Sequence, residues 1–121
     1  MRIRGNTMPL VKPIPERWRR CVCDALDSEE PARILATQRA IQDWESTFPS
    51  AFRYDLYLTL SDTLKDEQIE GSLVAMLGAD ETYQFFFFFD NRKMYAKVGL
   101  KDNSCVVFIF SAHIPLRGDK L

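Results

Sequence analysis

Residues 83–90 read Tyr-Gln-Phe-Phe-Phe-Phe-Phe-Asp, and this stretch decides the fold. Five successive phenylalanines leave a β-strand without a polar face, so both of its sides need cover. The run is short, aromatic and free of proline and glycine, which is typical of a central strand. Residues 90–93, Asp-Asn-Arg-Lys, combine turn chemistry with charge and would keep such a strand from aggregating. We therefore expect the rest of the chain to extend this strand into a sheet or to cover it.

The chain has the size and composition of one globular domain, with 121 residues, of which 46% are hydrophobic and 27% charged. The apolar runs 85–89 and 106–110 are far shorter than the roughly 20 residues of a membrane helix. Residues 1–7 have a basic start but no apolar segment after it, so we expect no signal peptide. These features predict a cytoplasmic protein that does not enter a membrane.

The three cysteines, Cys21, Cys23 and Cys105, fit a reducing compartment, because an odd number forms no closed set of disulfides. We expect all three to be small buried or half-buried side chains. The spacing Cys-Val-Cys is not the two-residue spacing that closes around zinc, and the chain has one histidine. The sequence therefore predicts no metal site and no cofactor.

The net charge of −1 conceals an uneven distribution along the chain. Residues 1–20 carry a charge of +5, residues 21–90 carry −10 and residues 91–121 carry +4. Such segregation occurs on ordinary surfaces. If it has a function, the basic ends meet a polyanion while the acidic middle faces elsewhere.

Residues 1–15 are expected to form an extended N-terminal arm, because three of them in its second half are prolines, which disfavour helix. The last of these, Pro15, suits the first turn of a helix over about 16–27. One face of that helix carries Trp18, Cys21, Val22, Ala25 and Leu26 at helical spacing.

Two further helices would complete a helical layer over residues 16–65. Ser28 is the expected N-cap of the second helix, which runs to about Thr47 and ends before Pro49. In the third segment, which Ser50 would cap, two patterns compete. Phe52, Leu56, Leu60 and Leu64 recur as in a helix, whereas Tyr54, Leu56, Leu58 and Leu60 alternate as in a strand. The helical pattern is longer, so we predict a helix.

The second half of the chain predicts an antiparallel sheet over residues 72–114, packed on the helices in an α+β fold. Its four strands, at about 72–77, 83–90, 94–100 and 104–114, follow one another as a meander. The first of them is ambiguous between strand and helix, and Gly71 disfavours the helix. Residues 115–121 would form a C-terminal tail that leaves the sheet at Pro115.

The register of the last strands decides which side chains share a face of the sheet. A three-residue loop, Lys101-Asp102-Asn103, with Asn103 in the left-handed region, would place two apolar sets on the helix side. These sets are Met94, Ala96, Val98 and Leu100, and Val106, Phe108, Phe110, Ala112 and Ile114. A hairpin around Asn91-Arg92 would add Phe85, Phe87 and Phe89 to them. Phe86 and Phe88 then point to the opposite side, the second face, where the arm, the tail, a second subunit in a homodimer or a ligand has to cover them.

Polar side chains converge on this second face, and they suit a phosphate ligand because donors and an imidazole dominate and Asp90 at the turn is the one carboxylate. The set comprises Arg92, Lys93, Tyr95, Lys97, Ser111 and His113, with Arg117 just beyond. In the predicted register Lys93 pairs with Ser111, and His113 lies beside the Asn91-Arg92 turn. Each residue also has a structural explanation, such as a surface histidine at a strand end or a lysine stem lying over phenylalanines.

If the ligand is RNA, this set can cleave it without a metal. The 2′-hydroxyl attacks the adjacent phosphate once a base removes its proton, and histidine is suited to that transfer near neutral pH. A cation stabilises the charge of the transition state. We therefore assign catalysis to His113, Lys97 and Tyr95, and phosphate binding to Arg92, Lys93, Ser111 and Arg117.

The stretch Lys93-Met94-Tyr95-Ala96-Lys97-Val98, followed by residues 106–113 (Val-Val-Phe-Ile-Phe-Ser-Ala-His), resembles the end of RelE-like and MqsR-like chains. These belong to the barnase–EndoU–colicin–RelE group of bacterial ribonuclease toxins, and the resemblance covers about residues 83–117. It implies helices followed by a four-stranded meander, metal-independent RNA cleavage and neutralisation by an antitoxin. It also implies an active role for Tyr95, Lys97, His113 and Arg117. The acidic middle segment departs from the group, in which many toxins are basic.

The sequence thus predicts a toxin-type endoribonuclease that acts on RNA and has a cognate inhibitor protein as partner. Two alternatives stay open. A non-enzymatic interaction module, such as an antitoxin, an immunity protein or a phage-derived inhibitor, would use the acidic residues 21–90. An RNA-binding module without catalysis would use Tyr95 and exposed phenylalanines.

Overall fold

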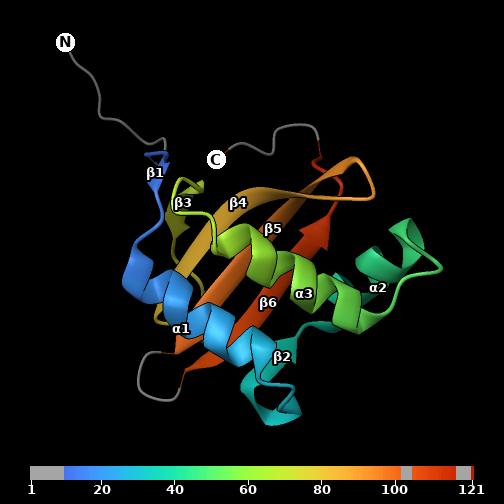
Figure 1. Ribbon diagram of the computed structural model, residues 1–121, viewed down its shortest axis with the longest axis horizontal. Helices are drawn as coiled ribbons and strands as arrows, with labels where there is room; N and C mark the ends of the chain where they lie inside the picture. The colour runs from blue at the N-terminus through green and yellow to red at the C-terminus, as the bar shows by residue number, and fades with distance from the viewer. Residues whose placement is uncertain (1–9, 102–104, 117–120) are drawn as a thin grey trace.

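The computed structural model describes residues 10–101, 105–116 and 121 of the chain. The elements are β1 (Lys12–Pro13), α1 (Glu16–Asp27), the 3-10 turn η1 (Pro31–Arg33), β2 (Ile34–Ala36), α2 (Gln38–Thr47), α3 (Arg53–Leu64), β3 (Glu70–Val74), β4 (Glu81–Phe89), β5 (Arg92–Lys101) and β6 (Val106–His113). The predicted α+β class is confirmed. Helices α1 and α3 lie side by side across the sheet, and α2 lies at the end of the molecule away from β1 (Figure 1).

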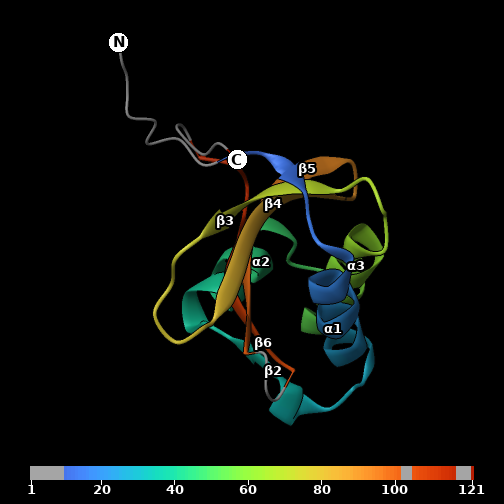
Figure 2. The same cartoon turned by 90° about the vertical axis from the view of Figure 1, so that its left-hand side faces the viewer.

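The strands form one six-stranded sheet in the order β1-β3-β4-β5-β6-β2. Its four central strands are antiparallel neighbours in chain order, as the predicted meander requires. Two short strands that the sequence did not predict extend it, because β1 pairs antiparallel with β3 and β2 pairs parallel with β6. The four-stranded meander is therefore the centre of a larger sheet, and the helices do not all precede the strands. Strands β3 and β4 arch over the helices in the side view (Figure 2).

The first and third predicted helices are confirmed as α1 and α3, but α2 is shorter than the helix predicted from Ser28. Residues 31–36 form η1 and β2 instead, because the chain bends at Pro31 and β2 pairs with β6. Helix α2 starts after Thr37, whose Oγ1 accepts a hydrogen bond from the amide of Ala40 at 3.0 Å. The N-cap residue of α3 is Phe52 and not Ser50, and the carboxylate of Asp55 in the first turn accepts a hydrogen bond from the Phe52 amide at 2.7 Å.

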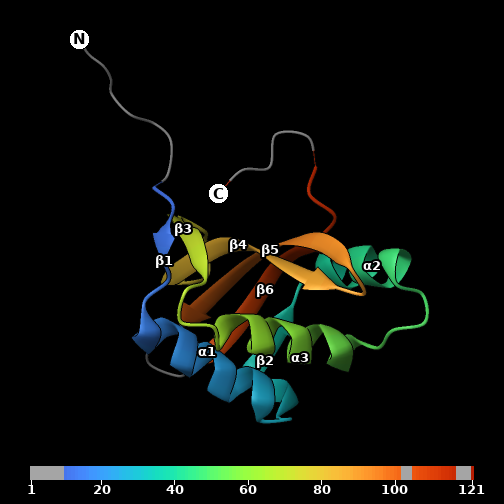
Figure 3. The same cartoon turned by 45° about the horizontal axis from the view of Figure 1, so that its top comes forward.

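All three helices contribute buried residues to one core, and α1 and α3 lie together on one side of the sheet (Figure 3). Trp44 of α2 packs on Phe48, Phe87 and Phe89, with ring centroids 4.8, 6.5 and 4.9 Å apart. Arg19 of α1 is buried, and it donates from Nε to Ile14 O at 3.1 Å and from Nη1 to Leu64 O at 2.9 Å. The guanidinium thus ties the N-terminal arm and the end of α3 to α1.

The β4–β5 hairpin preserves the predicted faces although its turn lies one residue earlier. Phe89 pairs with Arg92, and Asp90 and Asn91 have φ angles of 51° and 62°, as in a two-residue type I′ turn. The pairing differs from the predicted one by two residues, an even number, so the alternation of side chains is unchanged. Phe85 and Phe87 are buried in the core, as predicted.

The β5–β6 hairpin differs from the predicted one because β6 contains a bulge. Lys97 pairs with Ser111 but Val98 pairs with Ile109, so Phe110 is an extra residue in β6. Val107 and Ile109 therefore face the core, where Val106, Phe108 and Phe110 were expected. Lys101 belongs to β5 and pairs with Val106, so the prediction of a three-residue loop over residues 101–103 is also wrong. Asp102 and Asn103 lie outside the described residues.

The sequence suggested three unpaired cysteines, and this expectation is wrong for two of them. Cys21 of α1 and Cys105 before β6 form a disulfide across a sequence separation of 84 residues, with Cα atoms 6.0 Å apart. Cys23 is buried and has a free thiol, as expected. In the described parts of the chain, every helix is too short or too polar to cross a membrane.

Candidate functional site

Four polar side chains form a row across the second face, one from each central strand. Ser72 pairs with Gln84, Gln84 with Lys97, and Lys97 with Ser111, so the row runs from β3 to β6. Ser72 and Gln84 are buried, whereas Lys97 and Ser111 are half-buried. The solvent-accessible part of this polar row therefore lies on β5 and β6.

An aromatic row lies next to the polar row, one pairing step along the strands. It contains Phe86, Tyr95 and His113, which are cross-strand partners. The Tyr95 ring is edge-on to Phe86 at 6.4 Å and stacked on His113 at 5.1 Å, with 25° between the latter planes. The hydroxyl of Tyr95, a residue only 5% exposed, donates to Gln84 Oε1 at 2.6 Å. This hydrogen bond joins the two rows.

The orientation of His113 decides which of its nitrogens can exchange a proton with a ligand. Its Nδ1 lies 2.8 Å from the carbonyl oxygen of Ile114. A carbonyl oxygen only accepts, so the neutral ring carries its proton on Nδ1. Nε2 is then the nitrogen that can take up a proton, on a residue that is half-buried.

Near the β4–β5 turn, a lysine covers Phe86, one of the two phenylalanines of β4 that point to the second face. Lys93 pairs with Phe88, and its Nζ lies 4.0 Å from the centroid of the Phe86 ring. Phe86 is half-buried beneath this cation and beside Tyr95. Phe88, in contrast, is 64% exposed.

The charge on this face is positive. Glu70, two residues before Ser72 on β3, is the one carboxylate among the described strand residues that has the register of the second face. Within the described chain, neither Lys93 nor Lys97 takes part in an ion pair. Both ammonium groups are therefore available to an anion.

The structure brings most of the predicted site residues together, but in a different arrangement. Ser111 lies opposite Lys97 and not opposite Lys93, and His113 lies opposite Tyr95 and not beside the turn. The reason is that β6 is shifted along β5 by four residues relative to the predicted pairing. Arg92 pairs with Phe89 and therefore has the register of the core face, so it does not belong to the set on the second face. Arg117 lies outside the described residues.

Two members of the polar row were not assigned a role from the sequence. Gln84 had a signal, because it is the one polar residue between Tyr83 and Phe89 in an apolar strand. Ser72 had none. Its hydroxyl and that of Thr82, which has the same register on β4, are buried and have no hydrogen-bond partner in the described part of the chain.

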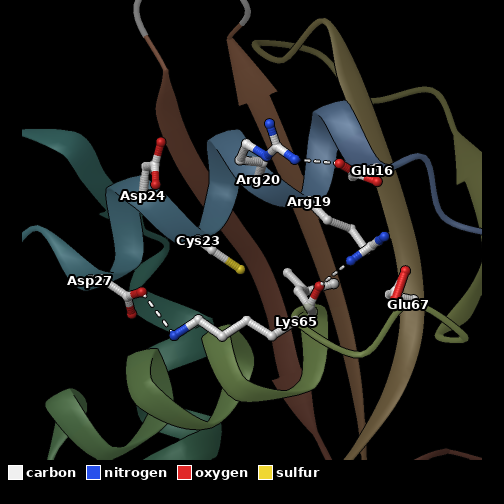
Figure 4. Close-up of a pocket in the computed structure, with 9 residues that line it drawn as sticks. Glu16, Arg19, Arg20, Cys23, Asp24, Asp27, Lys65 and Glu67 are labelled. Atoms are coloured by element: carbon white, nitrogen blue, oxygen red, sulfur yellow. Dashed lines mark hydrogen bonds and ion pairs between the residues drawn. The ribbon is translucent and has the colours of Figure 1, made fainter.

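A hollow of about 470 Å³ lies on the other side of the molecule, between α1 and the end of α3 (Figure 4). Two ion pairs lie in it, Arg20 with Glu16 and Lys65 with Asp27, whose carboxylate accepts from Lys65 Nζ at 3.0 Å and from Ser61 Oγ at 2.7 Å. The hydrogen bond to Asp27 raises the pKa of Lys65, and burial raises the pKa of the Cys23 thiol. Around it and elsewhere in the described chain, no three metal-binding side chains come together. These groups stabilise the helix pair, and the second face is the better candidate site.

Comparisons with protein-family models, with curated proteins and with solved structures find no match to this chain.

Proposed function

We propose that the protein is a metal-independent endoribonuclease of the toxin type, with its site on the second face. The arrangement of His113 carries this proposal. Its ring is stacked on a buried tyrosine, its Nδ1 is bonded to a carbonyl, and its Nε2 can accept a proton. Lys97 and Ser111 form the neighbouring cross-strand pair. A base, a cation and a hydroxyl donor thus share one carboxylate-poor surface.

In the proposed reaction, His113 Nε2 takes the proton of a ribose 2′-hydroxyl. The freed oxygen attacks the adjacent phosphorus, the bond to the 5′-oxygen of the next nucleotide breaks, and a 2′,3′-cyclic phosphate forms. The leaving oxygen takes a proton from solvent or from the imidazolium. Lys97 and the Ser111 hydroxyl stabilise the additional negative charge on the phosphate oxygens. DNA is not a substrate, because it lacks the attacking hydroxyl.

Tyr95 takes a different role in this proposal from the catalytic one that the sequence suggested. Its hydroxyl donates to Gln84 and its ring supports His113, so we assign it as a positioning residue. Replacement by phenylalanine keeps the stacked ring and is expected to preserve more activity than replacement by alanine. A cognate inhibitor protein as partner and a cytoplasmic location belong to the same proposal. The disulfide weighs against the location, because such bonds are typical of oxidising compartments.

The test is cleavage of a single-stranded RNA oligonucleotide by the purified protein in the presence of EDTA. We expect a cyclic phosphate at the new 3′ end and no cleavage where the attacking nucleotide carries a 2′-deoxy substitution. His113→Ala should lose about 10²–10⁴-fold in rate. Lys97→Ala should lose activity, while Lys101→Ala, an exposed lysine at the far end of the same strand, is the matched control. Folded protein that leaves RNA intact, or His113→Ala with undiminished cleavage, would contradict the proposal.

A further inference from the structure

Phe88 is an exposed aromatic side chain on the second face, beside the proposed catalytic residues. Gln84, Phe86 and Phe88 are two residues apart from one another along β4, so their side chains lie on the same face of the sheet. Phe88 is 64% exposed, and its ring makes no ring–ring contact within the described chain. Phe88 is the penultimate residue of β4, one pair away from the turn of the β4–β5 hairpin, so its exposed ring offers an aromatic face to a ligand at that end of the sheet.

The surroundings of Phe88 favour a ligand that is both flat and anionic. Lys93 lies directly across the strand pair from Phe88, and its ammonium sits over the neighbouring Phe86 ring. A flat group on the Phe88 ring would therefore lie next to a positive charge. A nucleobase with its attached phosphate has this combination, since every base has a face that stacks on an aromatic ring.

The distance to His113 fits one nucleic acid strand that contacts both places. Phe88 lies two strands away from His113 across the sheet and one pairing step along it. With ordinary strand spacings, this corresponds to about 12 Å between the backbones. A short single-stranded segment can cover that distance along the face, passing Lys93 and reaching the row of Tyr95 and His113.

We propose that Phe88, with Lys93 over Phe86, forms a subsite that stacks an unpaired base of single-stranded RNA near the cleaved bond. The choice of RNA as ligand rests on the proposed function. Double-stranded RNA does not fit, because its bases stack on each other and present only their edges in the grooves. The subsite therefore restricts the substrate to unpaired regions.

The first test compares Phe88→Ala with Phe52→Ala in the full-length protein. Phe52 is 76% exposed and stands before α3 on the helical side, so its replacement removes the same group from another surface. We expect Phe88→Ala to raise KM for a single-stranded RNA by about 5- to 150-fold, with kcat changed less than the KM. Phe52→Ala should leave both constants unchanged. Equal KM values for the two variants would overturn the subsite.

A second measurement separates the subsite from the proposed catalysis. Binding of a 2′-deoxy-substituted RNA oligonucleotide, followed by fluorescence anisotropy, needs no cleavage. Binding that weakens in Phe88→Ala, even if wild-type protein cleaves nothing, supports the subsite while the ribonuclease proposal fails. Cleavage with no dependence on Phe88 in either assay leaves the ribonuclease proposal standing and overturns the subsite.

An abasic substitution, moved along the oligonucleotide, locates the base that stacks. At one position it should weaken binding to the wild type but cause no further loss in Phe88→Ala, because the two changes remove the same contact. Losses that add at every position would overturn the proposal. The same holds if Phe88→Ala turns a dimer into a monomer and leaves RNA binding unchanged, since Phe88 would then contact a second copy of the chain.

Discussion

Removal of the Cys21–Cys105 disulfide is expected to lower the free energy of unfolding by about 4–5 kcal/mol. The bond joins α1 to the start of β6 and spans a sequence separation of 84 residues. In the chain-entropy description, closing a loop of this length removes about 15 cal/mol/K from the unfolded chain, or about 4.6 kcal/mol at 25 °C. Because domains of this kind have a total stability of about 5–15 kcal/mol, the bond supplies a large share of it.

The assay is urea unfolding of Cys105→Ser against the oxidised wild type, followed by circular dichroism. The single variants Cys21→Ser and Cys105→Ser and the double variant should lose the same stability, because each removes the same bond. Thiol titration in denaturant should find one thiol before reduction and three after it. Three thiols before reduction, or a variant as stable as the wild type, would refute the reasoning. Since Cys105 lies just before β6 and His113 at its end, removal of the bond should not affect the proposed RNA cleavage by the folded variant.

Two other predictions concern the packing of the bulge and the free thiol. Gly99→Ala should destabilise the protein by about 1–3 kcal/mol in thermal unfolding, because a Cβ there would lie 2.7 Å from Thr82 Oγ1 and 2.9 Å from the Phe110 ring. An unchanged melting temperature would show that Phe110 does not cover Gly99. Burial raises the pKa of Cys23 above its ordinary value of 9.0, so native protein at pH 8–9 should react with iodoacetamide more slowly than unfolded protein. The unfolded chain loses this proton first, so the contribution of Cys23 to stability falls as the pH rises above 9.0; equal alkylation rates would contradict its burial.

Much of the fold could be predicted where a single periodicity dominates the sequence. Helix α1 and the buried positions of α3 follow from apolar spacing, and the faces of the first hairpin follow from strand alternation. The bulge could not be predicted, because residues 106–110 are all apolar and fit either register. Strand β2 was also missed, because its three residues become a strand only through pairing with β6, 73 residues away. The disulfide depends on the same long-range placement.

The sequence predicted which residues form the candidate site better than it predicted how they are arranged. Alternation alone brings Tyr95, Lys97, Ser111 and His113 to one face, and the structure agrees. Which of them are neighbours depends on the β5–β6 register, and the shift of four residues at this end of β6 keeps these side chains on one face but changes every pair. The supporting contact from Tyr95 to Gln84 depends on side-chain orientation, which periodicity does not describe.

The parallel pairing of β2 with β6 has a consequence for the kinetics of folding. The two strands are joined by most of the chain, so they meet only after a long loop closes, and such contacts form slowly. Until then, β6 is an uncovered sheet edge that displays the apolar residues 106–110, and such edges pair readily with other chains. The segment Ile34–Ala36 thus protects the strand that carries His113 from intermolecular association once it is in place.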